Sequence, residues 1–140
     1  MHIVIDTNDL ISAALSPDGV PAKLLAKTLT DHQLVFTIAT FAELESRLWK
    51  PKFDRYINLD ERKAVLHDIS AAAVWVDVLP GIANTTYSRD ASDDMFIHAA
   101  IAAEAKLLIT GDQDLLVLAQ SLNDSRKLVI CKPAQALSLI

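Results

Sequence analysis

Five short apolar runs constrain the fold of this 140-residue chain more than any other feature of its sequence. The runs cover residues 3–5, 34–38, 74–79, 107–110 and 128–131, and each is short enough and rich enough in β-branched side chains for a buried strand. Segments with the apolar periodicity of helices lie between them. Because strands that alternate with helices build parallel sheets with helices on both faces, we predict an α/β fold around a parallel sheet of about five strands.

Helix starts are marked by a proline or by a polar side chain that can cap a first turn. The marking residues are Pro21, the pair Thr40 and Glu43 with capping-box spacing, Asp60, Asp90 or Ser92, and Asp114. The helix after Ser92 is Ala-rich and is predicted over about residues 93–105. We therefore expect at least one helix in every interval between the predicted strands.

The composition is that of a globular protein, with 51% apolar and 22% charged residues. No linker-like or repeated segment divides the sequence, so we expect residues 1–140 to form a single domain. The apolar runs fall short of the roughly 20 residues of a membrane-spanning helix, and the first residues lack the pattern of a signal peptide. Since Cys131 is the only cysteine and cannot form an internal disulfide, we expect a cytoplasmic protein without membrane contact.

The formal net charge of −5 argues against non-specific attraction to nucleic acid, but the charge is unevenly distributed. Residues 47–63 form a basic window, with Trp49, Phe53 and Tyr56 between the cations. Its candidate RNA-binding residues are Arg47, Lys50, Lys52 and Arg55. The window is open to two interpretations, a solvated surface or an RNA groove, and the aromatic spacing favours packing in a core or interface over stacking on bases.

Several acidic residues follow the ends of the predicted strands. Asp6 comes directly after the first strand, Glu43 lies shortly after the second, and Asp112 follows the fourth. Asp93 and Asp94 open the helix that leads into the fourth strand. Because an open parallel sheet binds ligands outside the carboxyl ends of its strands, we expect these carboxylates to meet at one edge.

Carboxylates that meet at one edge repel one another unless they are protonated or bridged by cations. Oxygen ligands with open positions suit Mg²⁺ or Mn²⁺, and ions held in this way activate water and stabilise charge on a phosphodiester. Each acid also has a structural explanation. Glu43 fits the capping box of Thr40, Asp93 and Asp94 complement a helix dipole, and Asp112 fits a turn. Asp114 is either a further ligand or a helix cap.

An ordered set of motifs along nearly the whole chain resembles PIN-domain proteins, specifically the small prokaryotic VapC-like ribonucleases that act as toxins of toxin–antitoxin pairs. The motifs are Asp6-Thr7-Asn8 followed by the apolar residues 10–15, Ser16-Pro17-Asp18-Gly19, Ala42-Glu43-Leu44, Lys50-Pro51-Lys52-Phe53, the acidic block 89–96, and Thr110-Gly111-Asp112-Gln113-Asp114-Leu115.

The resemblance implies a three-layer α/β/α sandwich and a metal-dependent endoribonuclease that uses Mg²⁺ or Mn²⁺. It also implies an acidic quartet, which carries over by motif to Asp6, Glu43, Asp94 and Asp112. Asp93 competes with Asp94 for the third position. Accessory roles fall to Asp114, and to Thr7 or Asn8 as supports of the first aspartate. An RNA substrate, a cognate antitoxin protein and a homodimer are the partners that the resemblance implies.

One residue departs from the family pattern, because Asp9 stands where these proteins usually have an apolar side chain. This charge supports an alternative hypothesis, a catalytically silent PIN-like module that binds RNA or a partner protein. A third hypothesis, a phosphoacceptor signalling domain, needs an aspartate at the end of the third strand. Asp77 lies inside that predicted strand instead, which argues against it.

Overall fold

In the computed structural model, which describes all 140 residues, five parallel strands form one sheet in the order β3-β2-β1-β4-β5. The strands are β1 (His2–Ile5), β2 (Gln33–Phe36), β3 (Val74–Trp75), β4 (Leu107–Ile109) and β5 (Val129–Cys131). All five predicted runs therefore contain a strand, and the prediction of a parallel sheet is confirmed.

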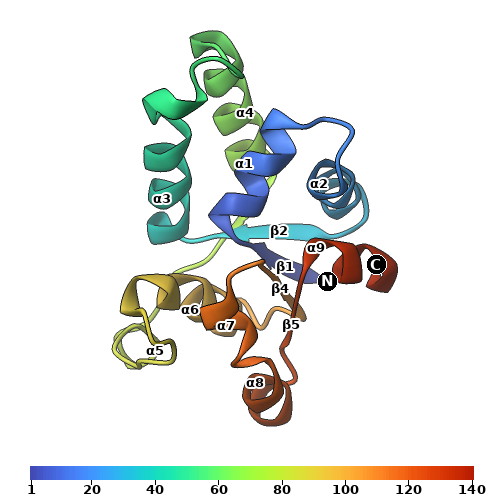
Figure 1. The fold of residues 1–140 in the computed structure, drawn as a ribbon. Helices are drawn as coiled ribbons and strands as arrows, with labels where there is room; N and C mark the ends of the chain where they lie inside the picture. The colour runs from blue at the N-terminus through green and yellow to red at the C-terminus, as the bar shows by residue number, and fades with distance from the viewer.

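Helices cover both faces of this sheet. They are α1 (Thr7–Leu15), α2 (Val20–Asp31), α3 (Ile38–Leu48), α4 (Leu59–Ala72), α5 (Pro80–Ala83), α6 (Asp94–Ala102), α7 (Gln113–Leu116), α8 (Ala119–Arg126) and α9 (Pro133–Leu139), with 3₁₀ turns η1 (Pro51–Phe53) and η2 (Ala91–Asp93). Helices α1 to α4 and α9 lie on one side of the sheet, and α5 to α8 lie on the other (Figure 1). This arrangement is the predicted three-layer α/β/α sandwich.

The strands read as continuous apolar runs because both of their faces are buried. Successive side chains point to opposite faces of a strand, so Ile3 and Ile5 enter the core beneath α1, α2 and α3, whereas Val4 enters the core beneath α6 and α8. Ile3 and Val4 are both at most 1% exposed. Since burying one such side chain is worth about 1.5–3 kcal/mol, the two cores hold the layers together.

The second strand ends earlier than predicted because Thr37 caps the next helix. Its hydroxyl accepts a hydrogen bond from the Thr40 N–H at 3.1 Å, and its own N–H donates to the Thr40 hydroxyl at 2.9 Å. Helix α3 thus begins at Ile38, and the predicted capping box of Thr40 with Glu43 is wrong. Glu43 lies beyond the first turn, where it has no capping role.

Other boundaries also move by a few residues. Asn58 caps α4 in place of Asp60, with the Glu61 side chain completing the capping box. The third strand ends at Trp75, before the predicted limit of residue 79. The fourth predicted helix is shorter than residues 93–105, because Asp90 caps the separate turn η2 and α6 covers only Asp94–Ala102.

The chain changes direction across the sheet at β1 and β4. From β1 the chain continues to β2 on one side, whereas β4 continues to β5 on the other side. Ligands of open α/β sheets bind in the crevice outside the carboxyl ends of strands at such a switch point. Asp6 and Thr110 directly follow β1 and β4, so both lie at this edge. No helix of the structure combines the length and the apolar character needed to cross a membrane.

Candidate active site

Asp6 is held at the carboxyl end of β1 by the structure on both sides of it. One carboxylate oxygen accepts a hydrogen bond of 2.6 Å from the Thr110 hydroxyl at the end of β4, and the other accepts one of 3.2 Å from the Asn8 N–H. The residue is 5% exposed. Burial raises the pKa of Asp6, and the negative charge of Asp112 adds to this rise, while the Thr110 hydrogen bond opposes it.

Thr110 links Asp6 to Asp112, and we did not assign it a role from the sequence. Its fully buried hydroxyl donates to Asp6 and accepts a hydrogen bond of 2.9 Å from the Asp112 N–H. The carboxylate of Asp112 then accepts from the Asp114 N–H at 2.9 Å and caps α7, so Asp112 and not Asp114 starts that helix. The signal was present in the sequence, since a buried strand that ends in threonine leaves a hydroxyl in need of a partner.

Three carboxylates gather beside this edge. Oxygen atoms of Asp93, Asp112 and Asp114 all lie within 4.8 Å of one another. Burial, followed by repulsion from Asp112, raises the pKa of Asp93 to about 6, and the charge of Asp6 contributes to the same rise. The site therefore concentrates negative charge that a cation would relieve.

Asp94 points into the protein rather than toward this cluster. Its two carboxylate oxygens accept hydrogen bonds from the backbone N–H groups of Tyr87 and Ser88, at 3.1 and 2.7 Å. The side chain is buried, with 3% of the residue exposed. Its oxygens thus hold the loop before η2, whereas the neighbouring Asp93 faces Asp112. Of these two rivals from the sequence, only Asp93 lies in the carboxylate cluster.

Glu43 lies on α3 and is paired with a cation. Its carboxylate contacts Arg47, one helical turn later, at 2.5 Å, and Arg47 also donates a hydrogen bond of 2.8 Å to the Asn8 side chain. The structure does not bring Glu43 into the cluster of Asp93, Asp112 and Asp114. Glu43 and Arg47 instead form a charged pair on the α3 side of the edge.

The first turn of α1 contains two buried oxygen atoms without a hydrogen-bond partner. They are Oγ1 of Thr7 and Oδ2 of Asp9. Burial, followed by repulsion from Asp6, raises the pKa of Asp9 to about 7. The charge that departs from the family pattern thus lies close enough to the site to interact with Asp6.

Asp114 carries a second arginine pair that the sequence did not suggest. Arg89 contacts both carboxylate oxygens of Asp114, with nitrogen–oxygen distances of 3.2 and 3.1 Å. The Arg89 side chain is 84% exposed, so the pair lies at the surface of the cluster. Two arginines, Arg47 and Arg89, therefore contact carboxylates of this edge.

Three of the four candidate RNA-binding residues line one small cavity. Arg47, Lys50 and Lys52 surround a volume of about 70 Å³ together with Asn8, Ile11 and Phe53, whereas Arg55 is exposed outside it. Buried Arg62 fixes the backbone that carries the two lysines, because its guanidinium donates to the carbonyls of Leu48 and Lys50 and pairs with Asp54.

The aromatic residues of the basic window mostly pack locally. The Arg62 guanidinium lies 5.5 Å from the centre of the Trp49 ring, and the Lys52 ammonium lies 5.1 Å from that of Phe53. Tyr56 is 63% exposed and makes no aromatic pair. The predicted preference for packing over free stacking surfaces thus describes Trp49 and Phe53 better than Tyr56.

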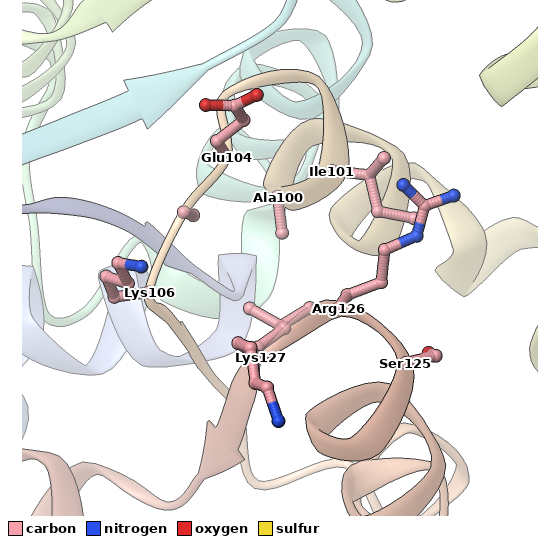
Figure 2. Close-up of a pocket in the computed structure, with 9 residues that line it drawn as sticks. Ala100, Ile101, Glu104, Lys106, Ser125, Arg126 and Lys127 are labelled. Atoms are coloured by element: carbon pink, nitrogen blue, oxygen red, sulfur yellow. The ribbon is translucent and has the colours of Figure 1, made fainter.

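The largest cavity of the structure, about 390 Å³, lies at the opposite end of the strands. This cavity lies near the ends of α6 and α8, and the residues that line it include Glu104, Lys106 and Arg126. Figure 2 shows that the charged ends of Glu104, Arg126 and Lys127 point in different directions. Because these charges do not converge, the acidic edge, where three carboxylates do, is the better candidate for chemistry.

The acidic cluster fits a divalent cation. Two oxygens bound to one Mg²⁺ at about 2.1 Å lie at most about 4.2 Å apart, so the oxygens here need only small side-chain rotations to share an ion. Burial is the main cause of the raised pKa of Asp93, and a bound ion would remove the second cause, repulsion from Asp112. Carboxylate oxygens without nitrogen or sulfur ligands are the donor set that Mg²⁺ and Mn²⁺ prefer.

Comparison with known proteins agrees with this fold. The chain is similar to solved structures of VapBC2 from Rickettsia felis bound to a DNA fragment from their promoter (TM-score 0.58, 12% identity, 93% of this chain and 97% of that chain) and of VapBC-1 from nontypeable Haemophilus influenzae (TM-score 0.59, 16% identity, 96% and 99%). An uncharacterized protein of Methanocaldococcus jannaschii is 33% identical over 129 residues, which cover 91% of this chain and 78% of the relative.

The sequence profile of the PIN domain family matches residues 2–114. This range holds every acidic residue discussed above and four of the five strands of the sheet. The chain therefore belongs to the PIN domain family.

Proposed function

We propose that this protein is a metal-dependent endoribonuclease that hydrolyses RNA phosphodiester bonds. The observation that carries the proposal is the carboxylate cluster of Asp93, Asp112 and Asp114 at the carboxyl edge of the sheet, to which the Thr110 hydroxyl links Asp6. Membership of the PIN domain family, whose members are nucleases, supports the same chemistry.

The proposed metal ligands are Asp6, Asp93 and Asp112, with Glu43 and Asp114 at the two sides of the site. Asp93 replaces Asp94 of the sequence-derived quartet, because both oxygens of Asp94 already accept backbone hydrogen bonds. A bound Mg²⁺ or Mn²⁺ supplies a Lewis acid that activates water and offsets negative charge on the phosphodiester. Thr110 orients Asp6 and keeps Asp112 in place.

The cationic side chains beside this edge are the proposed substrate-binding residues. Arg47, Lys50 and Lys52 line a cavity that shares Asn8 with the first turn of α1, next to Asp6. We propose that this cavity receives a backbone phosphate of RNA, since cationic side chains supply most of the affinity for the phosphate backbone. Exposed Arg55 is outside the cavity and is proposed to add only long-range attraction.

A protein partner is the other part of the proposal. The chain is similar to solved structures of VapBC proteins from two bacteria, which supports a role as the toxin of a toxin–antitoxin pair. The cognate antitoxin would be a protein that binds this chain and blocks its nuclease activity. A homodimer remains a prediction, which size-exclusion chromatography with light scattering would test.

Cleavage of a pooled, end-labelled RNA tests the nuclease proposal. The purified protein is incubated with Mg²⁺, Mn²⁺ or a chelator, beside Asp6→Asn and the control Asp31→Asn. Asp31 is an exposed acid at the end of α2 that leads into β2, away from the carboxyl edge. We expect metal-dependent cleavage by the wild type and by Asp31→Asn, and none by Asp6→Asn.

Two outcomes contradict the proposal. Cleavage by folded Asp6→Asn at the wild-type rate would show that another site, or a contaminating nuclease, carries the activity. Binding of RNA without any product, by a folded protein free of co-purified partners, would favour the silent binding module.

A further inference from the structure

Arginine–carboxylate pairs are few in this protein, and most of them lie at the acidic edge. The structure contains three ion pairs, Arg47 with Glu43, Arg62 with Asp54, and Arg89 with Asp114. The Arg62 pair has a structural explanation, since that guanidinium is buried and holds the backbone of the basic window. The other two involve carboxylates beside the proposed metal site.

The Arg89 pair contributes little to folding. The Arg89 side chain is 84% exposed, and ion pairs in water are screened by solvent and salt. The loop that carries Arg89 is held by other contacts, because Asp94 binds the backbone of Tyr87 and Ser88, and the Ser88 hydroxyl accepts from the Asp90 N–H. The loop therefore presents Arg89 in an ordered position without needing its charge.

The two arginines reach the edge from opposite sides of the sheet. Arg47 belongs to α3, whereas Arg89 contacts Asp114 of α7 and precedes α6. Figure 1 shows α3 on one side of the sheet, and α6 and α7 on the other. A strand that crosses the acidic edge would therefore pass cations on both sides of the metal site.

We propose that Arg89 binds a backbone phosphate of the RNA on the side of the site opposite to the cavity of Arg47, and exchanges Asp114 for that phosphate when RNA arrives. This inference rests on the proposed function. A guanidinium suits the exchange, because its planar donors bind carboxylate and phosphate with the same two-pronged geometry. The cleaved bond would lie between the two arginines.

The proposal predicts effects of opposite sign on two ligands. Arg89 attracts RNA, but it also offsets negative charge beside Asp93, Asp112 and Asp114. Removing this charge should therefore weaken RNA binding and tighten the binding of a divalent cation. A residue that only held the loop in place would weaken both, since disorder there displaces Asp93 as well.

The test measures both ligands in Arg89→Gln, with Arg126→Gln as the matched control. Arg126 lines the cavity at the opposite end of the strands (Figure 2); it is exposed and belongs to none of the three ion pairs. RNA binding is followed by anisotropy of a labelled single-stranded RNA in Mg²⁺ over a range of KCl concentrations, with Asp6→Asn added to each protein to prevent cleavage. Mn²⁺ binding is followed by electron paramagnetic resonance with Asp6 intact.

We expect Arg89→Gln to weaken RNA binding about tenfold, because a charge-assisted contact is lost. We also expect the slope of log affinity against log salt to fall by about 0.7, as for one phosphate contact of a single strand. Mn²⁺ should bind a few-fold more tightly. Arg89→Lys should restore the salt slope but only part of the affinity, and Arg126→Gln should change neither ligand.

Failure of this inference is distinct from failure of the proposed function. If the Asp6→Asn protein with Arg89 intact binds RNA, and adding Arg89→Gln changes this binding no more than adding Arg126→Gln does, the role of Arg89 is refuted while the nuclease proposal stands. If Arg89→Gln loses affinity for both RNA and Mn²⁺, the residue is structural. If the Asp6→Asn protein with Arg89 intact binds no RNA, the proposed function fails and this inference fails with it.

Discussion

Replacing Asp9 by asparagine should stabilise the metal-free protein at neutral pH and above. Asp9 lies in the first turn of α1, where its Oδ2 atom is buried without a hydrogen-bond partner. Burial, followed by repulsion from Asp6, raises its pKa to about 7 from an ordinary value of 3.8. The unfolded chain therefore releases this proton at a lower pH than the folded protein. Between these two pKa values the free energy of unfolding of the wild type falls as the pH rises. The full destabilisation by the Asp9 charge is reached above pH 7.

The size of this cost follows from the two pKa values. A difference of about three pH units corresponds to about 4 kcal/mol, at about 1.4 kcal/mol each. Asp9 is only half-buried, so screening by water reduces this figure to about 2 kcal/mol. The asparagine also loses the favourable interaction of a negative charge with the helix N-terminus, about 0.5 kcal/mol. The net gain is about 1.5 kcal/mol, or about 5 °C in Tm for a chain of this size.

Thermal unfolding followed by circular dichroism between pH 4 and pH 8, with a chelator present, measures this effect. The gain of Asp9→Asn over the wild type should be largest at pH 8 and should largely vanish at pH 4. Asp68→Asn, a change of an exposed acid on α4, serves as the control and should show little gain at any pH. An equal gain at both ends of the range, or no gain at pH 8, would refute the reasoning.

Substitutions at four further positions test which side chains hold the fold and which bind the metal. Thr110→Val should cost about 1–3 kcal/mol in urea unfolding and raise the pKa of Asp6 further, because both hydrogen bonds of the hydroxyl are lost, while Thr110→Ser should keep most of the stability. Asp94→Asn should destabilise the protein by a similar amount yet bind Mn²⁺ when folded, whereas Asp93→Asn should fold normally and lose Mn²⁺ affinity. Arg62→Leu should lower the free energy of unfolding by about 2–4 kcal/mol, measured in the same way, since two carbonyls lose their donor.

The sheet was predictable from the sequence because its strands are buried on both faces and carry no turn signals. The helix boundaries were less predictable, since several residues near each start can act as caps. Thr37 and Thr40 form reciprocal hydrogen bonds between backbone N–H groups and side-chain hydroxyls. Thr40 and Glu43 have the same three-residue spacing, so the sequence pointed to the wrong capping pair. Helices α1, α5, α8 and α9 were not predicted, because no proline or capping pair was identified at their starts.

Proximity of Asp6 and Asp112 followed from topology alone, because both terminate adjacent parallel strands. The direction in which each side chain points could not be predicted from the topology. Neighbouring residues at the start of a helix point about 100° apart, so Asp93 and Asp94 face different surroundings. The N–H groups of residues 87 and 88 bind Asp94, and their position determines which of the two carboxylates is turned inward. The arginine pairs depend on contacts between distant segments, which no local spacing encodes.

The most direct test of the account is the anomalous scattering of Mn²⁺ in crystals soaked with that ion. We predict a peak between the carboxylates of Asp93 and Asp112 and near Asp6, with Asp94 still bound to the N–H groups of Tyr87 and Ser88. The absence of a peak at this edge, or a peak ligated by Asp94 after release of those N–H groups, would contradict the proposed metal site.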